Sequence, residues 1–232
     1  MSWISSVKAN ILVMTRPATR YLRPPPPSHL KPVSRRWGYE RGTAIGRYYV
    51  DQFMLAHQDD ITGEILEIKN PRYTNSLGHE VTKSDVLDID ASNKHANIIT
   101  DLATADSVPD NQYDCFILTE TLQFVFDLAG AIRHSHRILK PGGVLLVSVP
   151  TTGPSDDELF DVDYWRFTGR GCRRLFGEVF GEENVQVEAF GNFVSCTAGL
   201  SGLAAEEIPS NELQTLDEKY TLGVGVRAVK AG

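Results

Sequence analysis

Short apolar runs recur along the chain at spacings typical of buried strands that alternate with helices. The runs that predict strands lie at 63–68, 81–86, 97–100, 113–119 and 144–149. Polar or helical stretches separate them, as in parallel strands joined by crossover connections. Alternating apolar and polar positions at 185–189 and 222–228 predict two further strands. We therefore expect an α/β fold with a doubly wound, seven-stranded, mostly parallel sheet whose last two strands are antiparallel.

Helical periodicity precedes the first strand and fills the longer connections. Apolar residues recur at helical spacing from Thr43 onward, with Thr43 as the expected N-cap. A second helix is expected to begin at an Asp127 cap and to stop at the Pro-Gly-Gly turn of 141–143. Further helical faces lie at 172–180 and around 200–207.

Charge divides the 232-residue chain into two parts. Residues 1–39 carry seven basic side chains and no acid, and they include the stiff run Pro24-Pro25-Pro26-Pro27. The remaining residues, 40–232, carry 16 basic and 30 acidic side chains. We expect a basic, proline-rich arm at 1–39, whose residues 1–33 hang outside the fold or drape over it, and one α/β domain at 40–232.

Composition also limits the classes of partner. Long nucleic acid is not expected, because its binding depends on Lys and Arg contacts with phosphate and the 40–232 domain is acidic. No run of 18 or more apolar residues occurs, so no transmembrane segment is expected and the protein is predicted to be cytoplasmic. An organellar address or membrane contact for the arm stays an alternative, and a homo-oligomer is left open. The three cysteines form no Cys-x-x-Cys pair, and no metal site is predicted.

Several segments together resemble class I S-adenosylmethionine-dependent methyltransferases. The resemblance covers roughly residues 40 to 230 and implies S-adenosylmethionine as cofactor. Its most specific element is ILKPGGVLLVSVP (138–150), a Lys-Pro-Gly-Gly turn followed by a strand, with the strand YDCFIL (113–118) before it at the correct spacing. The segments that carry it are a strand ending in Glu67, an acidic strand end at Asp88, Asp101-Leu102, YDCFILTETLQFVFD (113–127) and RILKPGGVLLVSVP (137–150).

The resemblance implies roles for residues at the first and fourth strand ends. Glu67 matches a carboxylate that lies near the methionine part of the cofactor and orders the following loop. Thr119 and Glu120 match positions beside the transferred methyl group. Tyr73 is a further candidate for the cofactor site, because its ring could substitute for the contacts of the family's loop glycines.

Three acidic positions and one apolar position are the candidates for the adenosine part. Asp88 matches the acid that accepts both ribose hydroxyls, with Asp90 as its rival. Asp101 and Leu102 match the positions that meet the adenine amine and ring. From the residues alone, each carboxylate could instead form a turn or cap a helix. Their shared place at the ends of successive strands favours the cofactor site.

Catalytic and acceptor-binding residues are predicted more loosely. Glu120 and His134 are the candidate acid-base residues for a hydroxyl acceptor. The block DYWRFT (163–168), like RGTAIGRYYVDQF (41–53), resembles a subgroup associated with small-molecule or sugar modification. Tyr164, Trp165 and Arg166 are therefore expected at the acceptor pocket, Trp165 for stacking and Arg166 for an anionic group. Core packing is the alternative for Trp165.

The first loop departs from the family pattern. Lys69 and Pro71 stand where the family has glycines, which let the backbone approach the cofactor with φ values that side chains resist. Lys69 is also a candidate partner for the cofactor's carboxylate. The predicted function is methyl transfer to a small-molecule acceptor, such as a sugar or secondary metabolite. The alternative is a protein of the same fold that has lost methyl transfer and serves as a binding partner or catalyses another reaction.

Overall fold

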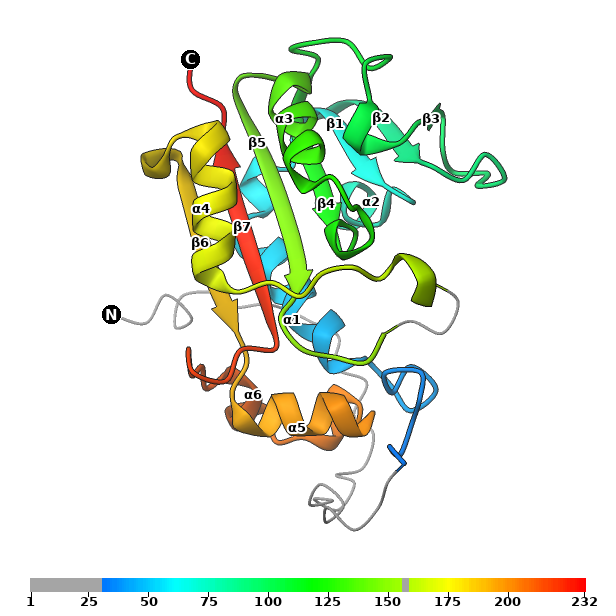
Figure 1. Ribbon diagram of the computed structural model, residues 1–232, viewed down its shortest axis with the longest axis vertical. Coiled ribbons are helices and arrows are strands. Elements are labelled where there is room, and N and C mark those ends of the chain that lie inside the picture. The colour runs from blue at the N-terminus through cyan, green and yellow to red at the C-terminus, as the bar shows by residue number, and fades with distance from the viewer. Residues whose placement is uncertain (1–30, 156–158) are drawn as a thin grey trace.

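A seven-stranded sheet forms the centre of the protein in the computed structural model, which describes residues 31–155 and 159–232 (Figure 1). The strand order is β3-β2-β1-β4-β5-β7-β6. Strands β1 to β5 are parallel, and β7 runs antiparallel to both β5 and β6. The predicted fold class is therefore confirmed. The strands are β1 (Gly63–Ile68), β2 (Val81–Asp88), β3 (Ile98–Ile99), β4 (Tyr113–Thr119), β5 (Leu139–Pro150), β6 (Val185–Phe190) and β7 (Gly223–Val229).

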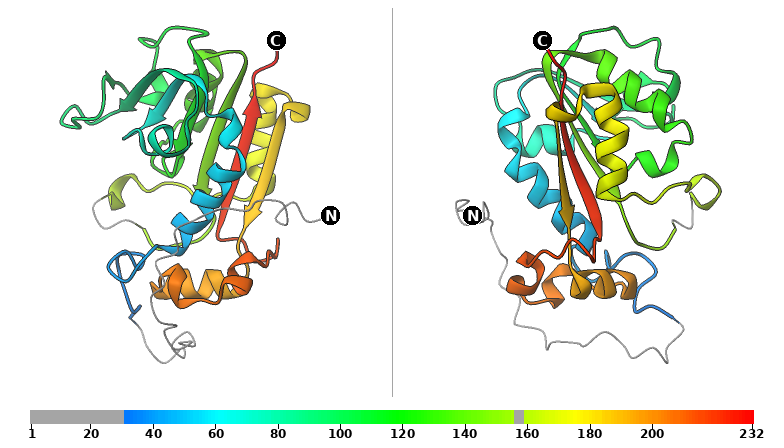
Figure 2. Two further views of the ribbon diagram at one scale, coloured as in Figure 1. Left: turned by 180° about the vertical axis from the view of Figure 1, so that it is seen from behind. Right: turned by 60° about the vertical axis from the view of Figure 1, so that its left-hand side comes forward.

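Helices cover both faces of this sheet. Helices α3 and α4 lie on one face, α1 lies on the other, and α5 and α6 lie at the end of the sheet where β5 finishes (Figures 1 and 2). The α-helices are α1 (Ile45–Ala56), α2 (Arg72–Leu77), α3 (Leu128–Ile138), α4 (Gly169–Phe180), α5 (Phe193–Ser201) and α6 (Ser210–Gln214). Short 3-10 turns are η2 (Gln58–Asp60), η3 (Leu102–Thr104), η4 (Leu122–Phe124), η5 (Phe160–Val162), η6 (Glu182–Asn184) and η7 (Ala205–Glu207). No helix of the described residues combines the length and the apolar character needed to cross a bilayer.

Two hydrophobic cores form because side chains alternate across each strand. In β4, Phe116 and Leu118 pack into the core beneath α3 and α4, whereas Cys115 and Ile117 pack into the core beneath α1. The central strands are apolar on both faces, which explains why they appear in the sequence as continuous apolar runs.

The predicted helix starts have different outcomes. Asp127 caps α3, since its Oδ1 accepts the Gly130 N–H at 2.9 Å, as predicted. The Thr43 cap is wrong, because α1 begins at Ile45 without a side-chain cap. The Thr43 hydroxyl donates instead to Glu206 Oε1 at 2.8 Å.

The chain before α1 is attached to the segment between α5 and α6. The Val33 N–H donates to the Ser201 carbonyl at 2.8 Å, and Arg41 pairs with Glu207. Ala44 and Ala204 form an isolated antiparallel bridge. Residues 33–39 of the predicted arm thus lie against the domain, while residues 1–30 fall outside the described part of the chain.

Candidate functional site

A cavity of about 340 Å³ lies at the carboxyl ends of β1, β4 and β5. Its walls include the start of α1 together with Trp37 and Tyr39. A shallower depression adjoins it over the ends of β1 and β2, and Lys69, Asn70 and Arg72 line both. This is the edge at which open α/β sheets bind ligands.

Glu67 closes the end of β1 but turns its carboxylate into the protein. Its side chain is buried, at 2% exposure. Oε1 accepts the Tyr73 N–H at 2.8 Å, and Oε2 accepts the Thr74 N–H at 2.9 Å and the Thr74 hydroxyl at 2.8 Å. Burial raises the pKa of the Glu67 carboxyl, and the hydrogen bonds from Thr74 and Tyr73 oppose that rise. Glu67 therefore fixes the first turn of α2, a helix that the sequence pattern did not predict.

The backbone N–H groups of the first loop already donate hydrogen bonds within the protein. Lys69 has φ +67°, so it adopts the left-handed conformation that a glycine would favour at this position. Pro71 has no N–H, and the amides of 73 and 74 bind Glu67. The Lys69 N–H donates to the Leu87 carbonyl at 3.0 Å. The Asn70 N–H donates to the Ile68 carbonyl at 2.8 Å, and the Arg72 N–H donates to the Asn70 carbonyl at 2.9 Å. No backbone N–H from 69 to 74 is therefore left for a ligand in the described structure.

Asp88 and Asp90 both line the depression, but only Asp88 is buried in its wall. Asp88 Oδ1 accepts the Asp90 N–H at 3.1 Å, and Oδ2 accepts from Asn93 Nδ2 at 2.6 Å. Each carboxylate oxygen keeps a further lone pair, which a ribose hydroxyl could use. Asp90 is exposed, and its Oδ1 accepts from the N–H and hydroxyl of Ser92 at 2.8 and 2.7 Å.

Asp101 and Leu102 are placed differently from the other predicted cofactor residues. Asp101 is exposed and caps η3, since its Oδ1 accepts the Ala103 N–H at 2.8 Å. Leu102 is buried in the core beneath α3. Neither lines the cavity or the depression, so their contact with adenine stays a prediction.

Glu120 is the acid-base candidate that the cavity contains. It follows β4 with φ +46°, and its Oε1 accepts from the Ser148 hydroxyl at 2.9 Å. Burial raises the pKa of Glu120; the Ser148 hydrogen bond and the charges of Arg47 and Arg166 act in the opposite direction. Thr119 also lines this cavity. A carboxyl group with a raised pKa in a cavity is suited to proton transfer.

The 163–168 block places one predicted residue in the cavity wall and two beside it. Arg166 lines the cavity and forms a two-point ion pair with the buried Asp163 carboxylate. The Tyr164 ring is 45% exposed and meets the Phe126 ring, itself 70% exposed, with 5.3 Å between centroids. Trp165 lies beneath them, half-buried, and its indole N–H donates to a backbone carbonyl of the preceding loop at 3.0 Å.

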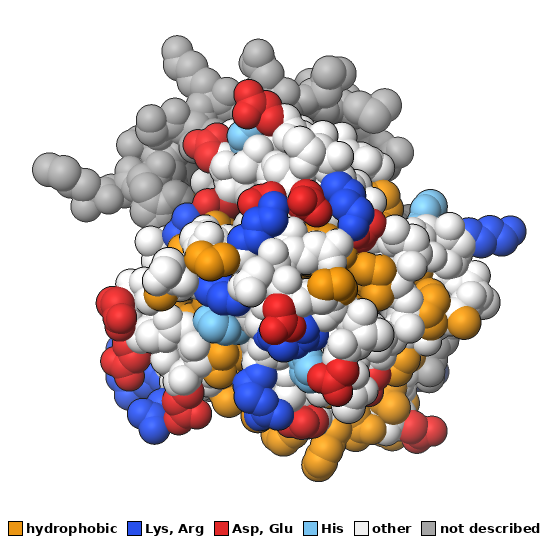
Figure 3. All heavy atoms as spheres, turned by 90° about the horizontal axis from the view of Figure 1, so that it is seen from above, with side chains coloured by type: hydrophobic (Ala, Val, Ile, Leu, Met, Phe, Trp, Pro, Cys, Tyr) orange, Lys and Arg blue, Asp and Glu red, His pale blue; other side chains and the backbone are white. Residues whose placement is uncertain are grey.

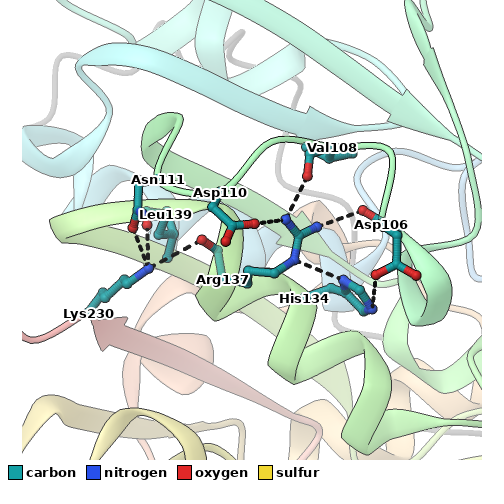
Figure 4. Close-up of polar contacts among 9 residues, drawn as sticks. Asp106, Val108, Asp110, Asn111, His134, Arg137, Leu139 and Lys230 are labelled. Carbon is teal, nitrogen blue, oxygen red and sulfur yellow. Dashed lines mark hydrogen bonds and ion pairs between the residues drawn. The ribbon is translucent and has the colours of Figure 1, made fainter.

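His134 lies apart from these residues, in a polar cluster beside α3 (Figure 4). Arg137 Nε donates to His134 Nδ1 at 3.3 Å, and Asp106 lies 3.9 Å from His134 Nε2. Lys230 adds donations to the carbonyls of Arg137 and Leu139, which joins the end of α3 to the end of β7. His134 lines neither the cavity nor the depression, so we leave it out of the proposed mechanism.

Basic and acidic side chains are interspersed on the end of the molecule where β5 begins (Figure 3). At the end of α3, Arg137 pairs with Asp110, and at the start of β5, Lys140 pairs with Asp114 at 2.8 Å. The charges of these two basic side chains are therefore neutralised by neighbouring carboxylates.

Arg47 is a site residue that the sequence reasoning did not select. It lies on α1, is half-buried and lines the cavity. Its Nη1 donates to the Tyr73 hydroxyl at 2.9 Å, and that hydroxyl donates to Asp51 Oδ1 at 2.7 Å. The block at 41–53 had drawn attention to this helix, but its helical pattern does not show that Arg47 faces the strand ends.

A family model described as "Methyltransferase domain" matches residues 35–180, which is more than half of the chain. The chain belongs to this methyltransferase domain family. The predicted class I S-adenosylmethionine-dependent methyltransferase is thereby confirmed, with S-adenosylmethionine as the cofactor of the class. No curated protein matches the chain.

Solved structures of this methyltransferase fold resemble the protein at low sequence identity. An S-adenosylmethionine-dependent methyltransferase from Archaeoglobus fulgidus is 13% identical, with a TM-score of 0.53 over 79% of this chain and 94% of that one. Haemonchus contortus phosphoethanolamine N-methyltransferase 2, in complex with phosphomonomethylethanolamine and S-adenosylhomocysteine, is 13% identical, with a TM-score of 0.53 over 78% of this chain and 53% of that one. The [4+2]-cyclase SpnF is 14% identical, with a TM-score of 0.53 over 82% of this chain and 83% of that one. At these identities the likeness shows the fold.

The residues at this edge would hold the cofactor through side chains rather than through loop amides, because no backbone N–H from 69 to 74 is left for a ligand. Asp88 offers carboxylate oxygens beside the first loop, and the cavity extends from that loop to Glu120. Lys69 keeps the backbone conformation of the glycine it replaces. The missing amides are a difference in the donor set, so an anionic group of the cofactor would depend on a basic side chain.

Proposed function

We propose that the protein transfers a methyl group from S-adenosylmethionine to a hydroxyl group of a small-molecule acceptor. The observation that carries this proposal is Glu120, a carboxyl group of raised pKa in the cavity wall at the end of β4. A hydroxyl nucleophile loses its proton during methyl transfer, and Glu120 is the carboxylate of the cavity wall that would accept it.

The cofactor supplies a methyl group on a sulfonium, which is activated for displacement. The protein's own residues would bind and orient the two reactants: Asp88 would accept hydrogen bonds from the ribose hydroxyls, and the cavity lined by Thr119 would hold the reacting end. Alignment of reactants and exclusion of water account for about 7 to 11 kcal/mol of barrier reduction in favourable systems.

The acceptor is proposed to be small and to carry a ring. The cavity volume of about 340 Å³ lies near the lower end of the range for small-molecule sites. Phe126 and Tyr164 have exposed rings that contact each other, and both residues belong to segments whose neighbouring residues Phe124 and Asp163 line the cavity. Such rings suit the face of a sugar or an aromatic acceptor.

Binding and product formation test this proposal separately. Titration calorimetry with S-adenosylmethionine and S-adenosylhomocysteine should give saturable heats. Incubation with S-adenosylmethionine and a panel of glycosides, phenols and matched carboxylic acids should add one methyl group to a hydroxyl-bearing member, detected by mass spectrometry. Methylation of the carboxylic acids alone would refute the hydroxyl acceptor.

A second function is favoured by the first loop, whose amides are all bonded or absent. The protein would then keep the fold without methyl transfer and would bind, or act differently on, a small molecule. The cyclase SpnF shares the fold, so the fold alone does not specify the reaction. Absence of heat and of thermal stabilisation with both nucleosides at millimolar concentration would favour this function over methyl transfer.

A further inference from the structure

Arg47 carries a charge that no carboxylate of the described residues neutralises directly. It is half-buried in the cavity wall, and no acidic oxygen of the described residues lies within ion-pair distance of its guanidinium. The guanidinium donates to the Tyr73 hydroxyl, and its charge acts on Glu120 from beyond ion-pair distance. A partly buried guanidinium whose nearest partner is a neutral phenol favours an anionic ligand. The arginines that do pair with carboxylates are Arg41, Arg72, Arg137, Arg166, Arg174 and Arg227.

The guanidinium is held in place by α2. The Tyr73 hydroxyl accepts from Arg47 and donates to Asp51, while the Tyr73 backbone N–H is held by Glu67. The charge of Asp51 is shared with Arg72, whose Nη2 lies 3.3 Å from it. Arg47 thus keeps N–H groups for a ligand while its position is fixed relative to the first loop.

The loop beside Arg47 cannot bind an anion through its backbone. Residues 69 to 74 use every amide that they have, as described above. Among the other described cations of the cavity wall, Arg72 and Arg166 pair with carboxylates, and Lys69 is exposed. An arginine held by a phenol loses less conformational freedom on binding a carboxylate than a free lysine does, and its guanidinium offers two parallel donors.

We propose that Arg47 binds the carboxylate of the methionine half of S-adenosylmethionine and so replaces the amides that the first loop lacks. This proposal rests on the proposed function, because it requires the cofactor to bind. It also specifies which part of the ligand Arg47 recognises. Arg47 lines the cavity but not the adjoining depression, whereas Asp88 lines the depression but not the cavity, so the ribose is assigned to Asp88 and the carboxylate to Arg47.

Two ligands and one charge-removing substitution test the proposal by calorimetry. S-adenosylhomocysteine carries the carboxylate, whereas 5′-methylthioadenosine lacks the amino-acid part. Arg47→Met should weaken S-adenosylhomocysteine binding by about 10- to 100-fold, the range for a charged hydrogen-bonded contact. Its affinity for 5′-methylthioadenosine should match that of the wild type. Arg174→Met, the same change on the exposed surface of α4, should alter neither affinity.

Two further variants separate the role of charge from that of the paired donors, and the role of Arg47 from that of Lys69. Arg47→Lys retains the charge but not the paired donors, so its S-adenosylhomocysteine affinity should fall between those of the wild type and Arg47→Met. This variant also serves if Arg47→Met fails to fold. Lys69→Met should bind S-adenosylhomocysteine like the wild type.

Each contrary outcome has a distinct meaning. Equal weakening of both ligands in the Arg47 variants would overturn the inference, because the carboxylate would then not be the group recognised. Weakening by Lys69→Met alone would assign the carboxylate to Lys69 instead. Unchanged S-adenosylhomocysteine binding, with a raised KM for the acceptor, would move the anion from cofactor to acceptor and would also overturn it. If the wild type bound neither nucleoside, the proposed function itself would fail.

Discussion

Replacing Glu67 with leucine or glutamine tests whether this buried carboxylate organises the first loop. Leucine fills similar space but accepts no hydrogen bond. Glutamine keeps one acceptor oxygen and removes the charge. The two variants therefore separate the loss of acceptors from the loss of charge.

The magnitudes follow from the three hydrogen bonds of Glu67. Leucine leaves the Tyr73 N–H, the Thr74 N–H and the Thr74 hydroxyl without their acceptor. At about 1–3 kcal/mol for each buried unsatisfied donor, and with partial hydration as the short helix loosens, we expect a loss of about 3–6 kcal/mol in the free energy of unfolding. Glutamine can still accept both bonds from Thr74, and only the Tyr73 N–H faces an NH₂ group. The glutamine variant should lose about 1–2 kcal/mol in the free energy of unfolding, because removal of a buried charge offsets part of the lost hydrogen bonding.

Urea unfolding followed by tryptophan fluorescence measures both losses. Trp37 and Trp165 report on the cavity wall and on the loop after β5. Far-ultraviolet circular dichroism over the same urea range checks that the transition is two-state. If the leucine and glutamine variants unfold at the same urea concentration, Glu67 does not act through its acceptors and the reasoning is wrong.

The pH dependence of folding stability provides an independent test of Glu67. Because burial raises the pKa of Glu67 above its ordinary 4.5, the folded chain binds this proton more tightly than the unfolded chain does. The stability of the wild type relative to Glu67→Gln should therefore be greatest below the ordinary pKa. It should be lost as pH rises through the raised value. A relative stability that grows with pH would contradict the direction of the shift.

Three further changes test neighbouring positions. Glu120→Gln should lower kcat by about 100-fold or more, as expected for loss of a general base, while S-adenosylhomocysteine affinity measured by calorimetry stays unchanged; an unchanged kcat would remove Glu120 from proton transfer. Asp88→Ala should weaken S-adenosylhomocysteine binding more than Asp90→Ala does, in the same assay, and the reverse order would move the ribose site to Asp90. Lys69→Gly should raise the melting temperature, because it relieves left-handed backbone strain of about 1 kcal/mol; a lower melting temperature would show that the lysine side chain stabilises the loop.

The sheet was predictable because its signals are local. Strand β4 lies within one apolar run, and Asp127 caps α3 through an amide three residues away. Features that depend on distant partners were missed or misassigned. The Thr43 hydroxyl serves a carboxylate 163 positions along the chain, so its local appearance as a cap was misleading. Helix α2 has only six residues, and its first turn depends on Glu67 rather than on its own pattern.

The site was predictable at strand ends and less so elsewhere. Glu67, Asp88 and Glu120 were selected because they lie at or just past the ends of apolar runs, and the structure brings all three to the cavity or its adjoining depression. Arg47 was missed because its importance comes from the Tyr73 hydroxyl, which reaches it from a different helix. Tyr164 does not line the cavity, and its pairing with an exposed phenylalanine could not be predicted from its own block.

The attachment of the chain before α1 to η7 has a consequence for biosynthesis. Trp37 and Tyr39 line the cavity, and the segment that carries them is held by Ser201 and Glu207. Because chains emerge from the ribosome in order, most of the sheet can pair before this wall has its anchor. The nascent protein would acquire this wall of the cavity only after α5 and η7 have left the exit tunnel.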